Sequence, residues 1–176
     1  LDWNDRGTCV LFGDGAGAAY LEESDKGIIS VVQGSIGKKG MVLNCESRRT
    51  HNIFTEAGIE HDYLHMDGQE VYKFAVRQCP KCLLEALEKA DMTADDIDYF
   101  VLHQANVRII ESVAKRLKAP IEKFPMTLGY TGNMSAASVP VMLDSLVRDG
   151  GLKRGDKVAM SAFGAGLTYG AIVLEW

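Results

Sequence analysis

Short apolar runs typical of strands alternate along this chain with segments whose apolar residues recur at helical spacing. This alternation limits the fold more than any other feature of the sequence. Strands that alternate with helices usually form a parallel sheet that is covered on both faces. The sequence therefore predicts a single α/β domain over residues 1–176, with a buried, mostly parallel mixed sheet.

The apolar runs and the breakers between them also place the individual elements. Strands are expected over Thr8–Phe12, Ala18–Glu22, Gly27–Ser35, Tyr99–Leu102, Phe124–Leu128, Lys157–Phe163 and Leu167–Glu175. Helices are expected from Met66 through Leu87 with a kink at Pro80, from Asn106 to Lys118, and over Val139–Arg148. The inward residues of the second helix are expected to be Val107, Ile110, Val113, Ala114 and Leu117.

Charge and hydropathy exclude several classes of protein. The chain has 176 residues, with 19 Lys and Arg against 24 Asp and Glu, and a formal net charge of −5. This acidic balance argues against nucleic acid as a partner, because nucleic-acid binders carry a basic surface. No apolar run reaches the roughly 18 residues of a membrane helix, so no membrane partner is expected. Since the chain does not begin with Met, we expect it to be part of a longer protein.

Cysteine usage indicates a reducing cytoplasm rather than a disulfide scaffold, because four cysteines are sparse for this length. Cys79 and Cys82 form the one C-x-x-C pair, and a zinc site would need further ligands at suitable spacing. Two partly buried thiols on one helix face are the favoured interpretation, and a metal or redox role is the alternative. We expect no metal.

Glycines near the start of the chain match a loose dinucleotide-binding pattern, Gly13-x-Gly15-x-x-Ala18. That pattern requires a helix directly after it and an acidic residue about 20 positions on, and neither is present. We therefore interpret these glycines as a tight turn between two strands.

Two polar side chains lie where an α/β sheet binds ligands. His103 follows an apolar strand and precedes a helix, so it can serve in catalysis or simply fill a strand–helix corner. Asn133 lies in a polar loop before another helix, where its amide can donate to a substrate oxygen or can belong to an ordinary turn. Neither alternative is excluded by the local sequence.

Basic residues gather on one expected helix, at Arg108, Lys115 and Arg116. Such a cluster can receive a phosphate or an acidic protein, or it can be a solvated helix face. No cysteine or serine lies at a strand-to-helix elbow that would activate it as a nucleophile. The chain thus carries part of a catalytic apparatus without its nucleophile.

Six segments, in order, resemble β-ketoacyl-acyl-carrier-protein synthase III, and only Lys38–Asp62 has no counterpart. The segments are Asp5–Thr8 (DRGT), Leu11–Ala18 (LFGDGAGA), Met66–Lys73 (MDGQEVYK), His103–Ile110 (HQANVRII), Gly132–Pro140 (GNMSAASVP) and Ala162–Gly170 (AFGAGLTYG). Related condensing enzymes that make quinolones or other ketides share much of this pattern. The resemblance implies the thiolase fold, in which two α/β halves form five αβαβα layers, and it identifies this chain with the C-terminal half.

The resemblance also implies a reaction. A cysteine of the N-terminal half takes an acyl group from acyl-CoA, and malonyl-acyl-carrier protein then loses CO2 to give a carbanion that attacks the acyl-cysteine. The full-length enzyme is expected to be a homodimer. CoA and phosphopantetheine thioesters act as substrates, and no cofactor is implied.

Residue by residue, the resemblance assigns His103 and Asn133 to the thioester oxygen of the malonyl group and the backbone amide of Ala165 to a second oxyanion hole. Carrier-protein binding is assigned to Gln104, Ala105, Asn106, Val107, Arg108, Lys73, Lys115 and Arg116. Binding of CoA or pantetheine is assigned to Gly68, Tyr72, Ala105, Asn106 and Phe163. The alternatives are a related enzyme with another acyl-CoA or acceptor, and a carrier-protein or CoA-binding module without catalysis. The isolated half is expected to be inactive.

Overall fold

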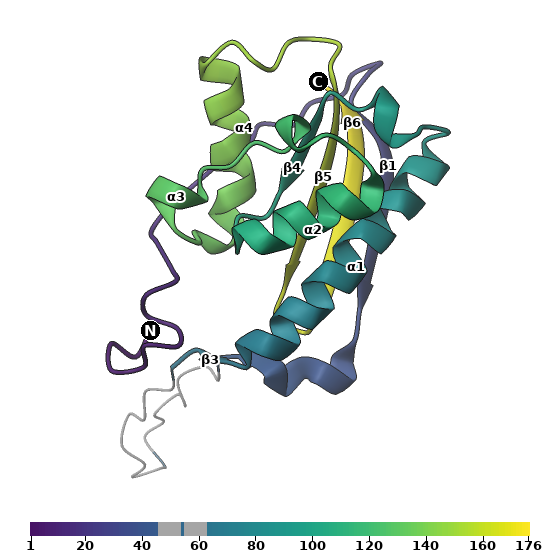
Figure 1. Cartoon of the computed structure of the whole chain (residues 1–176). Helices are drawn as coiled ribbons and strands as arrows, with labels where there is room; N and C mark the ends of the chain where they lie inside the picture. Colours follow the sequence, from purple (N-terminus) through teal and green to yellow (C-terminus); the bar gives the residue numbers. More distant parts are fainter. Residues whose placement is uncertain (46–53, 55–62) are drawn as a thin grey trace.

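The computed structural model describes residues 1–45, 54 and 63–176 of the chain (Figure 1). The strands are β1 (Ile28–Ser35), β2 (Leu43–Asn44), β3 (His65–Met66), β4 (Tyr99–Leu102), β5 (Lys157–Gly164) and β6 (Thr168–Glu175). The α-helices are α1 (Gly68–Lys89), α2 (Val107–Leu117), α3 (Leu128–Thr131) and α4 (Ser138–Arg148). Short 3-10 helices are η1 (Gly37–Val42), η2 (Ala94–Asp96), η3 (Ile121–Lys123) and η4 (Ser135–Ala137).

Four strands form the central sheet in the order β1-β6-β5-β4. β4 and β5 are parallel, whereas the β5–β6 and β6–β1 pairs are antiparallel. The mixed α/β sheet is confirmed, but the expectation that parallel pairs predominate is wrong. The reason is the connection between strands: the short link Ala165–Leu167 can only fold β6 back beside β5, and a parallel pair needs a long crossover.

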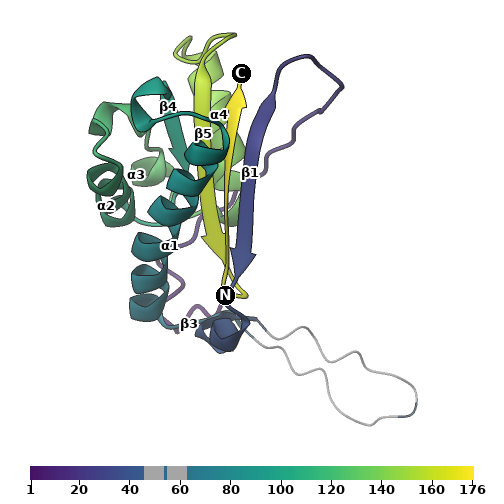
Figure 2. The ribbon, with the colours of Figure 1, turned by 90° about the vertical axis from the view of Figure 1, so that its right-hand side faces the viewer.

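Helices cover this sheet on two sides (Figures 1 and 2). α1 and α2 pack on one face, where Leu83 and Phe100 belong to the larger apolar core. α4 packs on the opposite face, where Met142 meets Val101 in a second cluster. Phe100 and Val101 are neighbours in β4, and both are fully buried. Because successive strand residues point to opposite faces, β4 is buried on both sides and its carboxyl end lies between the two layers.

α1 begins at Gly68, two residues after the expected start at Met66, which belongs to β3, and the helix carries Cys79 and Cys82 inward. The Asp67 side chain accepts hydrogen bonds from the first-turn amides, and the helix continues through Pro80 to its end at Lys89. A kink at Pro80 stays a prediction. Cys79 and Cys82 are buried, and burial raises the pKa of Cys79 to about 12. No group of three or more His, Cys, Asp or Glu able to hold a metal is found in the described part of the chain.

α2 is capped by Asn106, whose side chain accepts from the Arg108 amide. Ile110, Val113 and the other expected inward residues are buried, with one exception. Val107 is 39% exposed, so its expected inward orientation is wrong. It is the first residue of the helix and lies outside the buried stripe.

The N-terminal segment is not built as expected. Residues 8–11 form turns, Phe12 forms an isolated bridge, and Ala18–Glu22 has no regular secondary structure, so both predicted strands are wrong. Residues of this segment such as Leu11 and Tyr20 are exposed. An apolar run becomes a strand only beside a partner, and the described residues offer these runs only an isolated bridge at Phe12.

The strand expected over Phe124–Leu128 is also wrong. These residues form a loop between η3 and α3. The Phe124 ring stacks on Phe100, with ring centroids 4.7 Å apart and planes 7° apart. Burial of a loop aromatic thus produces the same apolar run as a short buried strand, which periodicity alone cannot separate.

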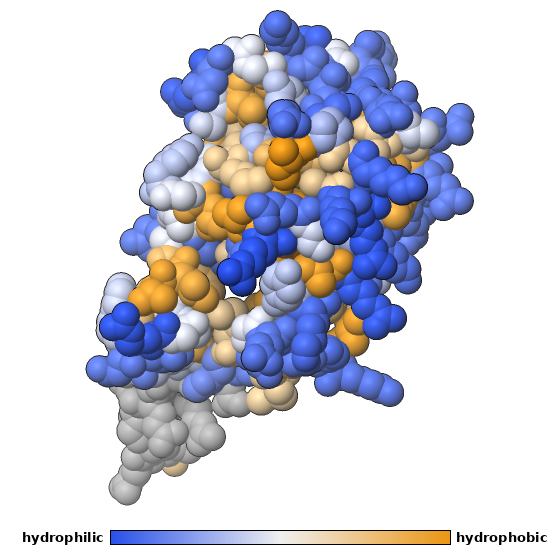
Figure 3. Space-filling model, viewed as in Figure 1, coloured by the Kyte–Doolittle hydropathy of each residue, from blue (hydrophilic) through white to orange (hydrophobic). Residues whose placement is uncertain are grey.

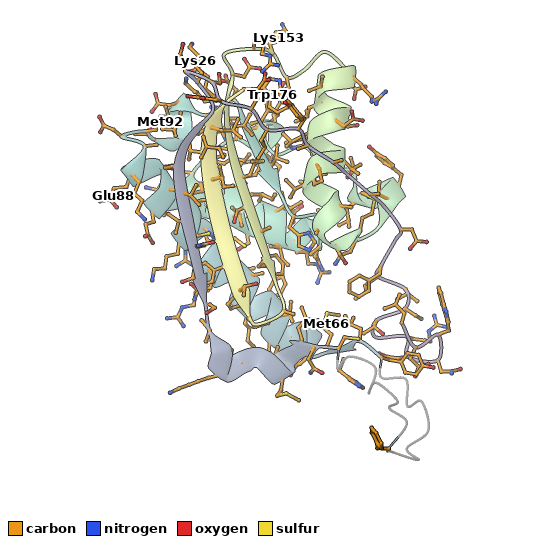
Figure 4. All side chains as sticks on the ribbon, turned by 180° about the vertical axis from the view of Figure 1, so that it is seen from behind. Lys26, Met66, Glu88, Met92, Lys153 and Trp176 are labelled. Atoms are coloured by element: carbon orange, nitrogen blue, oxygen red, sulfur yellow. The ribbon has the colours of Figure 1, made fainter. Side chains whose placement is uncertain are left out.

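The sheet face opposite α1 is only partly covered (Figure 4). α4 lies beside β4 and β5, whereas no described helix lies over β1 and β6 on this side, where Ile29 and Val31 of β1 are 41% and 48% exposed. Lys26 and Lys157 both pair with Glu175 at the end of the sheet farthest from Met66. No helix in the described ranges is long and apolar enough to cross a bilayer.

Candidate active site

A cavity of about 730 Å³ lies between the N-terminal segment, the first turns of α1, the carboxyl end of β4 and the β5–β6 turn. In the space-filling view the surface is hollowed between the N-terminal segment and the start of α1 (Figure 3). Eight of the predicted site residues line the cavity: Gly68, Tyr72, His103, Ala105, Asn106, Asn133, Phe163 and Ala165. The structure therefore brings together residues that the sequence separates by almost a hundred positions.

His103 is held by the core of the fold. It follows β4, and its backbone amide donates to the Ser161 carbonyl of β5 at 2.9 Å. The imidazole meets the Phe163 ring edge to face, with centroids 5.2 Å apart, and its Nδ1 lies 2.7 Å from Ser138 Oγ. Burial lowers the pKa of His103 to about 4, against a smaller opposing effect of the Ser135 backbone. The imidazole is therefore neutral at pH 7 and can donate one N–H.

Asn133 is held by the N-terminal segment. Its backbone amide donates to the Leu11 carbonyl at 3.0 Å, and its carbonyl accepts from the Gly13 amide at 2.9 Å. The side-chain Oδ1 accepts from the Ser135 amide at 2.9 Å. This bond uses the acceptor end of the carboxamide, so the Nδ2 hydrogens remain for a ligand in the cavity.

Gly13 is required for this arrangement. A Cβ added to Gly13 would lie 2.1 Å from the carbonyl oxygen of Thr131. This separation is too short for two atoms that are not bonded, so one of the two backbones would have to shift. Gly13 thus allows two backbones to approach closely, and Gly15 and Gly17 make room for the side chains of Met134 and Pro140. Their interpretation as a turn between two strands is wrong, because residues 13–17 run past the Asn133 loop and on to Pro140 of α4.

The cavity wall favours stabilisation of a developing negative charge. Among the described residues that line it, none carries a carboxylate, ammonium or guanidinium group. Beside a wall without charged groups, the electric field of a fixed N–H donor is weakly screened. The neutral N–H groups of His103 and Asn133 can therefore stabilise an oxyanion in the cavity. The arrangement suits chemistry in which a thioester or similar carbonyl oxygen gains charge.

Ala165 lies in the turn between β5 and β6. Strand pairing ends at Gly164 and Thr168, so the Ala165 amide lies beyond the paired residues. The Thr168 hydroxyl donates to the Ala165 carbonyl at 2.9 Å, which fixes the turn. Ala165 also lines the cavity, as a second oxyanion donor must.

The charged residues assigned to carrier-protein binding are exposed on α1 and α2. Arg108, Lys115 and Arg116 are exposed on α2. Lys73 is exposed on α1, where its Nζ lies 2.8 Å from Glu70, and this carboxylate also binds Lys39 at 2.7 Å. These basic residues lie outside the cavity wall, as does the partly exposed Val107.

The set of residues expected to bind the carrier protein needs one correction. The side chain of Gln104 is fully buried. Its Nε2 donates to the carbonyl oxygens of Leu102 at 2.9 Å and Pro125 at 3.4 Å, and its Oε1 accepts from the Thr127 amide at 3.1 Å. A side chain with these three bonds cannot contact a partner. Gln104 instead ties the end of β4 to the loop that leads toward Asn133.

Sequence reasoning missed Ser138. This residue is fully buried at the start of α4 and bonds to His103, although no local pattern distinguishes it from other small polar residues before a helix. Ser135, Thr168 and Tyr169 also line the cavity and were not singled out. Their place in quoted motifs, GNMSAAS and FGAGLTYG, was the only available signal.

Two family models match the chain. The model described as 3-oxoacyl-[acyl-carrier-protein (ACP)] synthase III C terminal matches residues 87–176, which is about half of the chain. The model described as 3-oxoacyl-[acyl-carrier-protein (ACP)] synthase III matches residues 1–40. The two matches together include His103, Asn133, Ala165 and the segment that holds Asn133.

Curated relatives that match the whole chain have the same name. The β-ketoacyl-[acyl-carrier-protein] synthase III of Synechococcus sp. (strain WH7803) is 48% identical over 182 residues, covering 100% of this chain and 54% of the relative. The enzyme of the same name from Clostridium novyi (strain NT) is 47% identical over 178 residues, covering 100% of this chain and 55% of the relative. The chain thus spans about half the length of these relatives.

Solved structures show the same fold. The synthase III from Thermus thermophilus is 40% identical with a TM-score of 0.84, covering 100% of this chain and 55% of that chain. The priming β-ketosynthase of the R1128 polyketide pathway is 40% identical with a TM-score of 0.89, covering 99% of this chain and 53% of that chain. The thiolase-like α/β fold is confirmed. This chain belongs to the 3-oxoacyl-[acyl-carrier-protein] synthase III family.

Proposed function

We propose that this chain supplies the decarboxylation site of a β-ketoacyl-[acyl-carrier-protein] synthase III, which condenses acyl-CoA, with acetyl-CoA as the first choice, with malonyl-carrier protein to start fatty acid synthesis. One observation carries the proposal: His103 and Asn133 line the same cavity, whose described lining residues include no Asp, Glu, Lys or Arg. The acyl-accepting cysteine is assigned to residues outside this sequence, because the described cysteines are absent from the cavity wall.

The chemistry needs two donors at one oxygen. When malonyl thioester loses CO2, the C–C bond breaks and its electron pair moves into an enolate whose charge lies largely on the thioester oxygen. N–H groups of His103 and Asn133 stabilise that charge without a metal. The carbanion then forms a bond to the acyl carbon on the cysteine, and the pair of the breaking C–S bond returns to the thiolate. The Ala165 amide serves the oxyanion of this second step.

The substrates reach the site through a common arm. Gly68, Tyr72, Ala105, Asn106 and Phe163 line the cavity and are assigned to the pantetheine of CoA and of the carrier protein. The exposed basic side chains of Arg108, Lys115, Arg116 and Lys73 are assigned to the acidic surface of the carrier protein. CoA and carrier thioesters act as substrates, with no further cofactor. A cytoplasmic homodimer of the full-length protein completes the proposal.

The deciding experiment measures CO2 release from malonyl-carrier protein by the full-length protein. His103→Ala and Asn133→Asp are each expected to lower the rate by about 10²–10³-fold. Asn133→Asp keeps the acceptor that binds the Ser135 amide but replaces the donor by a carboxylate. Asn4→Asp adds the same charge at an exposed position and serves as its control. Unchanged CO2 release by either cavity variant contradicts the proposal.

A second candidate is a related condensing enzyme with another acyl-CoA or acceptor. The likeness to the R1128 priming β-ketosynthase favours it, since that structure has the highest TM-score of those described above. Profiling the full-length enzyme with acyl-CoAs of different chain length separates the two candidates. If the chain is a carrier-protein or CoA-binding module without catalysis, it should bind these ligands and release no CO2. The same result is expected if the isolated half is inactive.

A further inference from the structure

The buried hydroxyl of Ser138 lies within hydrogen-bond distance of three groups. Its Oγ is 2.7 Å from His103 Nδ1, 2.9 Å from the Ser135 carbonyl oxygen and 3.3 Å from the Gln104 amide nitrogen. Ser138 is the first residue of α4 and has no exposed surface. Water therefore cannot replace any of these partners.

One hydrogen has two acceptors in this cluster. The Gln104 amide can only donate to the hydroxyl oxygen. The Ser138 hydrogen then goes either to the Ser135 carbonyl or to His103 Nδ1. A neutral imidazole carries a single N–H, so the two arrangements correspond to opposite tautomers of His103. If the Ser138 hydroxyl donates to the Ser135 carbonyl, Nδ1 carries the imidazole proton and donates to the serine. If the hydroxyl donates to Nδ1, the imidazole proton is on Nε2.

The distances favour the second arrangement. Hydrogen bonds donated by O–H are usually 2.7–2.8 Å long between oxygens, whereas those donated by N–H have a mode near 2.9–3.0 Å. The separation of 2.7 Å between Ser138 Oγ and His103 Nδ1 fits a hydroxyl donor. The separation of 2.9 Å to the Ser135 carbonyl, to which the hydroxyl can also donate, lies at the long end of the O–H···O range. The Ser135 backbone also raises the pKa of His103, an effect smaller than that of burial.

We propose that Ser138 is a positioning residue that donates to Nδ1 and thereby holds His103 in the tautomer with its proton on Nε2. This inference rests on the proposed function, in which His103 must donate to the thioester oxygen. Nδ1 is occupied by the serine, so Nε2 is the nitrogen left for a substrate. Rotation of the hydroxyl to the Ser135 carbonyl gives the opposite tautomer, which presents a lone pair to the oxyanion and cannot stabilise it.

The same short segment thus serves both donors. Asn133 binds the Ser135 amide through Oδ1, and Ser138 binds the Ser135 carbonyl or the imidazole. No carboxylate is found among the described residues of the cavity wall, so the groups left to set the tautomer are the Ser138 hydroxyl and the Ser135 carbonyl.

Solid-state ¹⁵N NMR of the full-length protein with labelled histidine tests the tautomer directly. The His103 signals are assigned by their loss in His103→Gln. At pH 7 the wild type is expected to show a protonated Nε2 and a hydrogen-bonded, unprotonated Nδ1. Ser138→Ala is expected to move the proton toward Nδ1, whereas Ser138→Thr keeps the hydroxyl and the wild-type signals. Ser145→Ala, two turns along α4, is the matched control.

CO2 release from malonyl-carrier protein gives the second readout. Ser138→Ala is expected to lower kcat by roughly 10- to 100-fold with little change in KM, because a donor is misoriented but binding is retained. Ser138→Thr is expected to recover most of this loss.

A wild-type His103 with its proton on Nδ1 overturns the inference, and this result does not depend on any substitution at Ser138. A Ser138→Ala protein with the wild-type tautomer and rate also overturns it. Failure of the proposed function looks different, since His103→Ala and Asn133→Asp would then release CO2 at the wild-type rate whatever the tautomer.

Discussion

His103 and Asn133 line one cavity but are supported by regions of opposite character. His103 follows β4, whose residues Phe100 and Val101 have no exposed surface, and its amide bonds to the neighbouring strand β5. Asn133 lies in a loop whose backbone is bonded to the N-terminal segment at Leu11 and Gly13. Leu11 is 43% exposed, and its neighbour Val10 is 63% exposed.

The difference separates two ways of positioning a catalytic group. The core supports His103 through burial on both faces of a strand, so local changes at the surface should leave it in place. Asn133 depends on two backbone bonds to a segment with little buried surface, and such segments open at low free energy. We therefore expect the Asn133 side of the site to be the first to fail.

The largest expected effect comes from removing the donors themselves. His103→Ala and Asn133→Asp should each lower CO2 release by about 10²–10³-fold, and the double variant should be far less impaired than the product of the two losses. The reason is that both donors are proposed to act on one oxygen. Single-turnover release of ¹⁴CO2 measures all three rates. Multiplicative losses would indicate that the donors act on different atoms.

A substitution at Gly13 should break the Asn133 support alone. Gly13→Ala forces a shift against the Thr131 carbonyl, and we expect CO2 release to fall roughly 10- to 100-fold and stability by about 1–3 kcal/mol. The ¹⁵N signals of His103 should not change. Gly37→Ala is the control, because an added Cβ there meets nothing within 4 Å. Altered His103 signals in Gly13→Ala would show that the two supports are not independent.

The bridge between the two regions should matter for stability rather than for partner binding. Gln104→Leu leaves the Thr127 amide and the Pro125 carbonyl without their partner, so the free energy of unfolding in urea should fall by about 1–3 kcal/mol. The KM for malonyl-carrier protein should stay within about twofold, since the proposal assigns that affinity to exposed basic side chains. Arg108→Ala should give the opposite pattern, with a raised KM and unchanged stability. A raised KM in Gln104→Leu would restore Gln104 to the docking surface.

The smallest effect concerns pH. Burial lowers the pKa of folded His103 to about 4, below its ordinary value of 6.5. Between these pH values His103 binds a proton in the unfolded chain but stays neutral in the folded protein. His103 therefore makes the free energy of unfolding decrease as pH falls from 6.5 toward 4. Urea unfolding at pH 7 and pH 5 should show a steeper decrease for wild type than for His103→Gln. Equal slopes would mean that the imidazole is charged in the fold.

The sequence predicted the core-supported side of the molecule well. β1, β4, β5 and β6 lie within one residue of their predicted ranges because each has neighbours that bury it, and the helical stripes follow from local spacing. His103 could be singled out because the end of a buried strand is a local feature that a single segment displays.

The Asn133 side depends on long-range contacts that one segment does not display. Nothing local indicates that Gly13 passes the Thr131 carbonyl, or that Gln104 and Ser138 turn inward to bind backbone and imidazole. Thr8–Phe12 has the composition of a strand but finds no full partner among the described residues. Antiparallel pairing of β5 with β6 follows from the short link between them, which is a feature of the sequence itself.

The most direct test of the central claim is a crystal structure of the full-length protein with a malonyl thioester analogue that cannot lose CO2. The account predicts that Nε2 of His103 and Nδ2 of Asn133 both lie about 2.7–3.1 Å from the thioester oxygen. A thioester oxygen bound elsewhere, with either nitrogen directed away from it, would contradict the account.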